Sequence, residues 1–469
     1  MTDKCSADDQ DAPSTTAQPS AGPGMSIRAG LNVGGSLSIG ASLGIGPAEA
    51  TEQAMPRERA SEPVARPPGA GGASDPERVV RIGSPAALLA IVPQLLSFEP
   101  QMSLVVLGAE LPRGRVRLTV RFDLPATPDL ELADEIARRA MGVLAAQGFR
   151  AGVAVGYGPG RLVTPVADAV RKRAADLGFR LSEFLRVEDG RYWSYLCTEP
   201  GCCSPDGEPY DVARHPVTAA FAEAGAGPVL ASREELAALI APLDGPEGEA
   251  MFQATLRAEE RSARLIEQAA SSGRNGAARR LIGDAGLAAV REAIDCYRAG
   301  GEFSSDADAA WLLVALQDLR VRDDAWARMD PRSMKEHLRL WTDLTRRARP
   351  GYVAAAASLL AFVAWQNGNG ALANVALDRA QADNPGYSMA RLLREVIDSG
   401  APPRLARLPM TPEEVAASYA EAGQWEYSEG ADSGLSRDFD EASLDDKDDP
   451  DGESDADAGS ATAAGPDPR

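Results

Sequence analysis

Three cysteines near the middle of the sequence have the spacing best suited to chemistry. Cys197 is followed after four residues by the adjacent pair Cys202 and Cys203. Thiolates this close could bind zinc, with Asp206 or His215 as a fourth ligand, or form a redox site. A structural zinc site usually has two separated cysteine pairs, and adjacent cysteines rarely point the same way. We therefore expect a cluster of packed thiols and retain a zinc-stabilised module as an alternative.

A glycine-rich segment, Gly156–Gly160, lies between an apolar strand pattern and a helical pattern. Backbone amides at a helix N-terminus can bind an anion. The spacing is not that of a dinucleotide-binding loop, because Arg161 occupies the position where the last glycine would fall. We expect a strand-to-helix loop here, with small-ligand binding as the alternative.

An alternating polar face is predicted for the strand that follows Gly114. Its polar residues are Arg115, Arg117, Thr119, Arg121 and Asp123. This face could receive an acidic ligand, or it could be a solvated face with an internal arginine–aspartate pair, which we favour. Asp123 stands at the strand end, where α/β proteins often place function. It is one carboxylate without an identified partner.

Histidines are scarce, since His215 and His337 are the only two in 469 residues. Most general acid–base catalysis and most zinc catalysis uses histidine. The spacing of His337 from Trp341 and Leu344 is that of one helix face, which predicts a packed residue. No Gly-x-Ser-x-Gly or His-Glu-x-x-His motif occurs. The sequence therefore favours a protein without catalysis or cofactor, although carboxylate or lysine chemistry stays open.

Residues 78–243 carry the alternation of strand and helix patterns that is typical of an α/β domain. Helices are predicted to open at Ser84-Pro85, Thr127-Pro128 and Thr164-Pro165, each a cap residue followed by proline. Strands are predicted over 103–108, 116–124, 153–155, 184–187 and 191–196, the last two joined by an Asp189-Gly190 hairpin turn. We expect a mixed sheet with flanking helices.

Residues 244–428 predict an all-α domain. Helical patterns cover 251–270, 284–298, 307–320, 351–366, 370–383 and 387–398. Capping boxes begin at Ser232 and Ser333. The pair 351–366 and 370–383 resembles a tetratricopeptide-like hairpin, and its single occurrence favours a helical bundle over a solenoid. The tryptophans of this half are expected to fill its core.

The two ends of the chain differ from the middle in composition. Residues 1–77 are rich in Gly, Ser, Ala and Pro, and they predict a disordered low-complexity tail. Residues 429–469 hold 14 acidic and 3 basic side chains and predict an acidic disordered tail. The formal net charge of −21 therefore belongs mainly to the ends. No cluster of Lys and Arg suited to phosphate contacts appears, so direct nucleic-acid binding is not expected.

Composition also predicts the compartment. No stretch approaches the 18 or so apolar residues of a membrane helix, and the first 20 residues predict no secretory signal. Five sparse cysteines, an odd number, favour reduced thiols. The prediction is a cytoplasmic protein without a membrane partner.

Several stretches together resemble the actinobacterial family catalogued as domain of unknown function 4192. They are Arg81–Ala90, Ser103–Gly108, Leu118–Pro125, Trp193–Cys197, Cys202-Cys203 with Gly207, Val321–Asp323, Gly370–Ala380 and Asn384–Ala390. The family usually has proline directly after the paired cysteines, whereas Ser204 stands there in this chain. The resemblance implies a compact cytosolic domain and no particular activity.

The sequence alone leaves the function unknown. The absence of catalytic signatures favours a non-catalytic interaction or regulatory protein that binds protein partners through its helical half. An enzyme or small-ligand-binding protein is the alternative. It would use a pocket lined by Asp123, the Gly158 loop and the Cys197–Cys203 segment.

Overall fold

The structure is a computed structural model, and it describes residues 39–40, 84–111, 115–198, 204–223, 227–271, 277–403 and 411–428. The chain divides into two units, residues 1–420 and 421–469. The predicted tails, 1–77 and 429–469, lie outside the described residues except for Ile39–Gly40. The boundary predicted at residue 243 stays a prediction.

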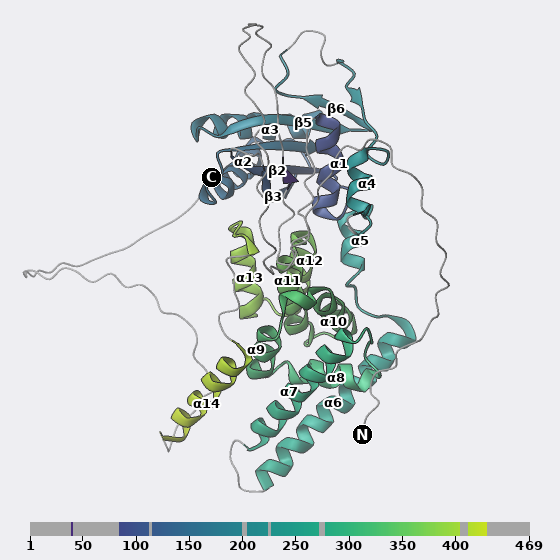
Figure 1. The fold of residues 1–469 in the computed structure, drawn as a ribbon, viewed down its shortest axis with the longest axis vertical. Helices are drawn as coiled ribbons and strands as arrows, with labels where there is room; N and C mark the ends of the chain where they lie inside the picture. Colours follow the sequence, from purple (N-terminus) through teal and green to yellow (C-terminus); the bar gives the residue numbers. More distant parts are fainter. Residues whose placement is uncertain are drawn as a thin grey trace, which may run out of the picture. The chain divides into compact units, whose positions relative to one another are not determined.

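A mixed sheet forms the N-terminal part, as predicted (Figure 1). Its strands are β1 (Ile39–Gly40), β2 (Ser103–Glu110), β3 (Arg115–Asp123), β4 (Ala151–Tyr157), β5 (Arg180–Glu188), β6 (Arg191–Ser194) and β7 (Glu208–Pro209). The strand order is β1-β3-β2-β4-β5-β6-β7. The pair β4–β5 is parallel and the other pairs are antiparallel. Because β2 runs against both β3 and β4, strands β3, β4 and β5 point the same way.

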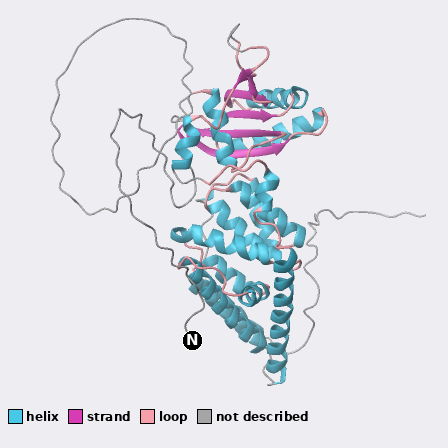
Figure 2. Ribbon diagram, turned by 90° about the vertical axis from the view of Figure 1, so that its right-hand side faces the viewer, coloured by secondary structure: helices cyan, strands magenta, loops and turns pink. Residues whose placement is uncertain are grey.

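Helices cover both faces of this sheet (Figure 2). Helices α2 (Leu130–Ala146) and α3 (Gly160–Asp176) pack on one face, in a core cluster that includes Leu104 and Phe184. Helices α1 (Pro85–Leu96) and α4 (Pro216–Glu223) pack on the other, in the cluster of Leu107 and Val155. The continuous apolar run of β2 is explained by this, because its side chains are buried on both faces.

Short-range signals were correct at some element ends. The Ser84 side chain caps α1 by accepting from the Ala87 amide at 3.2 Å. Asp189 and Gly190 form the hairpin turn with φ of 48° and 72°. The prediction at Thr127 is wrong, because Asp129 caps α2 instead, accepting from the Leu132 amide at 3.0 Å.

The predicted helix start at Thr164-Pro165 is also wrong. Helix α3 begins at Gly160, and Pro165 lies inside it. The first four amides of a helix need no partner within it. The chain can therefore turn into a helix directly after β4. Pro165 lies beyond these first amides, so it removes one intrahelical hydrogen bond and its ring crowds the carbonyl of Arg161.

The strict alternation predicted for β3 breaks at Arg117. Ala109 pairs with Val116, but Gly108 pairs with Leu118, so Arg117 is an extra residue on β3. Val116 consequently packs in the α1-side cluster, while Leu118 packs in the α2–α3 cluster. A bulge of this kind moves every side chain beyond it on the same strand to the opposite face of the sheet.

Gly152 gives a sharp test of the sheet geometry. A Cβ at this position would lie 2.2 Å from the backbone oxygen of Leu107 on the neighbouring strand. A backbone atom in a sheet cannot move aside as the end of a flexible side chain can. We expect Gly152→Ala to lower the free energy of unfolding by about 2 kcal/mol. Gly142 in α2 has nothing within 4 Å, so Gly142→Ala should raise it by about 0.5–1 kcal/mol. Urea unfolding measures both, and equal effects would contradict this packing.

The C-terminal part is mostly helical, as predicted. Its helices are α5 (Arg233–Ala238), α6 (Gly245–Ser271), α7 (Ala277–Arg298), α8 (Asp306–Ala315), α9 (Leu319–Ala327), α10 (Met334–Arg347), α11 (Val353–Gln366), α12 (Gly370–Asp383), α13 (Ser388–Asp398) and α14 (Pro412–Ser428), with a 3₁₀ turn at Pro331–Ser333. Ser232 caps α5 as predicted, because its hydroxyl accepts from the Glu235 amide at 3.3 Å. The reciprocal bond of a capping box is shifted by one residue, since the Glu235 carboxylate accepts from the Ala231 amide at 2.8 Å.

Two helix boundaries differ from those predicted in this part. The single helix predicted over 307–320 is two helices, because Asp318 caps a new helix by accepting from the Arg320 amide at 2.9 Å. Ser333 makes no capping bond to α10. Asp330 instead caps the preceding 3₁₀ turn, accepting from the Arg332 amide at 2.9 Å.

Helix α11 is the centre of the helical core. Every residue from Val353 to Trp365 is buried, which explains why this helix is apolar on all sides. It packs on α10, α12 and α13. Trp311, Trp341 and Trp365 are buried as expected. The likeness of the α11–α12 pair to a tetratricopeptide hairpin stays a prediction.

Candidate functional site

The carboxyl ends of β3, β4 and β5 meet at one edge of the sheet, where sequence analysis placed Asp123 and the Gly158 loop. A Cβ on Gly158 would lie 3.3 Å from Leu124, the residue after Asp123, so these two predicted features are neighbours. Asp123 is an exposed carboxylate that bonds Arg121 at 2.6 Å. The internal arginine–aspartate pair expected on this strand is therefore present.

The glycine-rich loop is shorter than its sequence indicates. Strand β4 continues to Tyr157 and α3 begins at Gly160, so only Gly158 and Pro159 connect them. The Arg186 guanidinium occupies the space beside Gly160, where a Cβ would lie 2.2 Å from its Nη1. It also stacks on Trp193 at 3.7 Å and bonds Glu188 at 3.2 Å. These contacts make Arg186 part of the packing under α3, in agreement with a connecting loop.

Three ionisable residues near this edge were missed by sequence reasoning. Burial raises the pKa of the Glu99 carboxyl. Burial, and then the nearby Tyr210 and Glu99, raise the pKa of the Tyr157 hydroxyl. In the described part of the chain this hydroxyl has no hydrogen-bond partner. Groups with a raised pKa keep their protons to a higher pH. No sequence motif could identify these three residues together, because Glu99 follows α1, Tyr157 ends β4 and Tyr210 follows β7.

The cysteine segment is only partly described. Cys197 is half-buried after β6, and Cys202 and Cys203 lie outside the described residues. The segment after them folds back toward β6, since Trp193 Nε1 donates to the Pro205 oxygen at 3.0 Å. His215 accepts from the Val217 amide through Nδ1 at 3.3 Å. Within the described residues no three metal-binding side chains are grouped. The zinc alternative stays untested.

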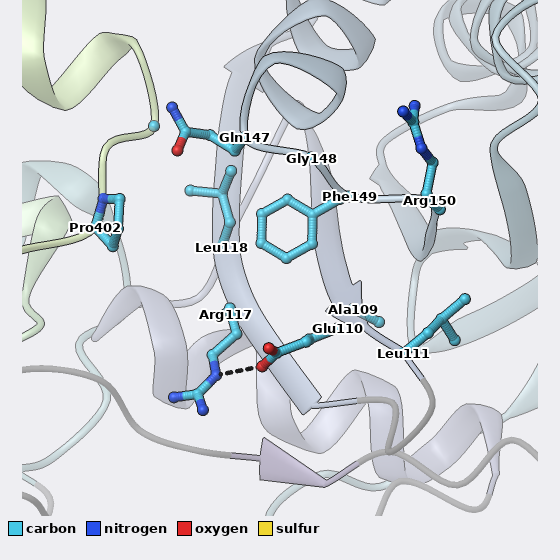
Figure 3. A pocket seen from close by; sticks show the side chains of 11 residues that line it. Ala109, Glu110, Leu111, Arg117, Leu118, Gln147, Gly148, Phe149, Arg150 and Pro402 are labelled. Carbon is cyan, nitrogen blue, oxygen red and sulfur yellow. Dashed lines mark hydrogen bonds and ion pairs between the residues drawn. The ribbon is translucent and has the colours of Figure 1, made fainter.

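A pocket of about 360 Å³ lies at the opposite edge, where β2 ends and where β3 and β4 begin (Figure 3). Its walls come from the end of β2, the start of β3, the turn from α2 to β4, and the segment after α13. Its lining residues are Ala109, Glu110, Leu111, Arg117, Leu118, Gln147, Gly148, Phe149, Arg150, Gly400 and Pro402. None of these except Arg117 was a candidate in the sequence.

Residues 399–402, here called the strap, close the pocket against α2. Gln147 Nε2 donates to the Ser399 oxygen at 2.8 Å. Gly400 has φ of 72°, and a Cβ there would lie 2.7 Å from Val143 and 3.1 Å from Leu118. The left-handed backbone and the close approach both require glycine. The strap is therefore fitted to the sheet and α2 rather than merely passing them.

The pocket combines an apolar surface with charge. The Phe149 ring stands at its centre, with Leu118 on one side and Arg150 on the other (Figure 3). At the lower end Arg117 Nε donates to Glu110 Oε2 at 3.1 Å. Its volume of about 360 Å³ falls in the usual range of small-molecule sites, although its lining is about equally polar and apolar, whereas most such sites are mainly apolar.

The fold and this pocket define a mixed α/β protein with a helical C-terminal part and a small cavity beneath a C-terminal strap. The family model for the domain of unknown function DUF4192 matches residues 85–404. The chain therefore belongs to this family, as the sequence resemblance indicated. Comparison with curated proteins and with solved structures found no match. Among the described residues, no helix is both long and apolar enough to cross a bilayer.

Proposed function

We propose that this protein is a non-catalytic regulatory protein that binds a small molecule in the Phe149 pocket. One observation supports it above all: the pocket is built jointly by the sheet and by the strap, which are about 250 residues apart along the chain. A ligand there would contact both parts at once. We further propose that it acts in the cytoplasm, which the sparse, odd set of cysteines supports.

The strap links the pocket to the helical core. It follows α13 without a break, and α13 packs on α11 and α12. A ligand that contacts Gly400 and Pro402 adds contacts that hold the strap against the sheet and α2. Ligand binding to the folded state alone also raises the free energy of unfolding in proportion to the logarithm of ligand concentration over Kd. Ligand binding should therefore stabilise the contact between the strap and α2.

A fragment screen against a filled pocket tests the proposal. Ala109 lines the pocket, so Ala109→Trp should fill part of it, whereas Ala175→Trp adds the same side chain at an exposed position of α3. In ligand-observed NMR we expect fragments that bind the wild type and Ala175→Trp but lose binding to Ala109→Trp. If every binding fragment also binds Ala109→Trp equally well, this pocket is not the ligand site.

Binding of a protein partner is the second candidate, and α13 supports it. Leu392 and Val396 lie one helical turn apart and are 62% and 37% exposed, although the opposite side of α13 is buried. Burial of such a pair is favourable in an interface. A partner retained by the wild type should be lost from Leu392→Lys/Val396→Lys, with unchanged thermal stability. Retention of the partner would exclude this face.

A further inference from the structure

Arginines gather at the edge of the sheet that holds the Phe149 pocket. Arg115 and Arg117 begin β3, Arg150 precedes β4, and Arg180 begins β5 beside it. Arg150 and Arg180 are exposed, and neither forms an ion pair within the described part of the chain. Glu110 is the one carboxylate among the residues that line the pocket. This edge therefore attracts anions.

A flat apolar surface lies directly beside this charge. The Phe149 ring and the Leu118 side chain are half-buried, and Pro402 of the strap lies next to Leu118 (Figure 3). Aromatic rings stack favourably on such a surface, with offset or edge contacts between ring and ring. An inorganic ion would leave this surface exposed, whereas a purely apolar ligand would gain nothing from the positive charge at this edge.

Glu110 is the carboxylate of the pocket that contacts Arg117. It is exposed, and its Oε2 accepts from Arg117 Nε at 3.1 Å. Guanidinium groups bind carboxylates and phosphates through paired N–H donors. A ligand anion therefore competes with Glu110 for Arg117. Removal of the Glu110 charge should strengthen anion binding. If the pocket bound a cation instead, the same change should weaken binding.

The geometry points to a small organic anion with a flat apolar body as the ligand of the Phe149 pocket. The ring of the ligand packs on Phe149 and Leu118, and its anionic group bonds Arg117, with Arg150 contributing charge from the other side of the ring. This assignment rests on the proposed function, since it names the ligand class for the same pocket.

Three probes separate charge from shape in calorimetric titrations of the full chain. They are 2-naphthoate, its neutral counterpart 2-naphthamide, and inorganic phosphate. We expect 2-naphthoate to bind about tenfold more tightly than either of the others, because only it uses both the ring surface and the arginines. Higher salt should weaken 2-naphthoate binding and leave 2-naphthamide unchanged.

Variants assign the effect to named side chains. Arg117→Gln should weaken 2-naphthoate binding about tenfold without changing 2-naphthamide, and Glu110→Gln should strengthen 2-naphthoate binding several-fold. Arg150→Gln, at an exposed position, should weaken it as well even if Arg117→Gln disturbs the bulge. Arg180→Gln is the matched control, since Arg180 begins the next strand but does not line the pocket.

The outcomes separate this assignment from the proposed function. Equal affinity for 2-naphthoate and 2-naphthamide, or tighter binding of 2-naphthamide, overturns the anion assignment but leaves a ligand site if Ala109→Trp abolishes binding. Weaker 2-naphthoate binding by Glu110→Gln also overturns it. If none of the three probes binds, the anion assignment fails, and the fragment screen then decides the proposed function independently.

Discussion

Replacement of Asp383 by alanine is expected to lower the free energy of unfolding by about 3 kcal/mol. Asp383 ends α12, yet its carboxylate accepts from three amides at the start of α11, those of Gly351 at 2.6 Å and of Val353 and Ala354 at 3.0 Å. These amides have no partner within α11. Because Val353 and Ala354 are buried, water cannot fully replace the carboxylate at their two amides, although Gly351 is exposed.

A graded series shows whether the capping bonds cause the loss. Asp383→Asn keeps one acceptor oxygen and removes the charge, so it should lose about half as much stability as Asp383→Ala. Asp176→Ala removes an exposed carboxylate at the end of α3 and should change stability by less than about 0.5 kcal/mol. Urea unfolding of the three variants is the measurement. An Asp383→Ala protein as stable as Asp176→Ala would refute the capping role.

Stability is expected to fall by about 3 kcal/mol as the pH is lowered from 6.5 to 4, because of His337 alone. This side chain is 1% exposed, and neither ring nitrogen makes a hydrogen bond of good geometry in the described part of the chain, although the Arg328 backbone lies close enough to favour the protonated form weakly. Burial, and then the nearby Arg298 charge, lower the pKa of His337 to about 4, although Asp330 and Glu336 oppose the shift. The folded protein thus keeps this imidazole neutral.

The loss of stability at low pH follows from the difference in proton binding between the folded and unfolded states. In the unfolded chain an ordinary histidine has a pKa of about 6.5, so below that pH the unfolded state takes up a proton that the folded state refuses. The free energy of unfolding therefore decreases down to the folded pKa and is unaffected by His337 below it. At pH 7 and above, His337 contributes no pH dependence.

His337→Leu isolates this contribution from that of the carboxylates. The variant should unfold with a weaker pH dependence between 6.5 and 4, while His215→Gln should keep the full dependence of the wild type. Urea midpoints at pH 7.5 and 4.5 for the three proteins give the comparison. Parallel losses in the wild type and His337→Leu would show that the buried imidazole is not responsible.

Local signals in the sequence were enough for most of the elements. The Ser84 cap, the Asp189-Gly190 turn and the Ser232 cap each depend on atoms within about four residues. Hydrophobic periodicity likewise predicted the mixed sheet and the helical part, since it reports which side of an element is buried. These signals failed where two nearby residues could both cap the same helix, as Thr127 and Asp129 could for α2.

The sequence by itself determined the fold class, the family and the buried character of His337, because these follow from composition, periodicity and a series of short motifs. Only the tertiary structure decided the bulge at Arg117, the capping of α11 by Asp383 and the Phe149 pocket. Each of the last two depends on contacts between side chains and backbone at least 29 residues apart, and about 250 for Gln147 and Ser399. The sequence pattern of a single helix or strand cannot predict contacts between residues so far apart in the chain.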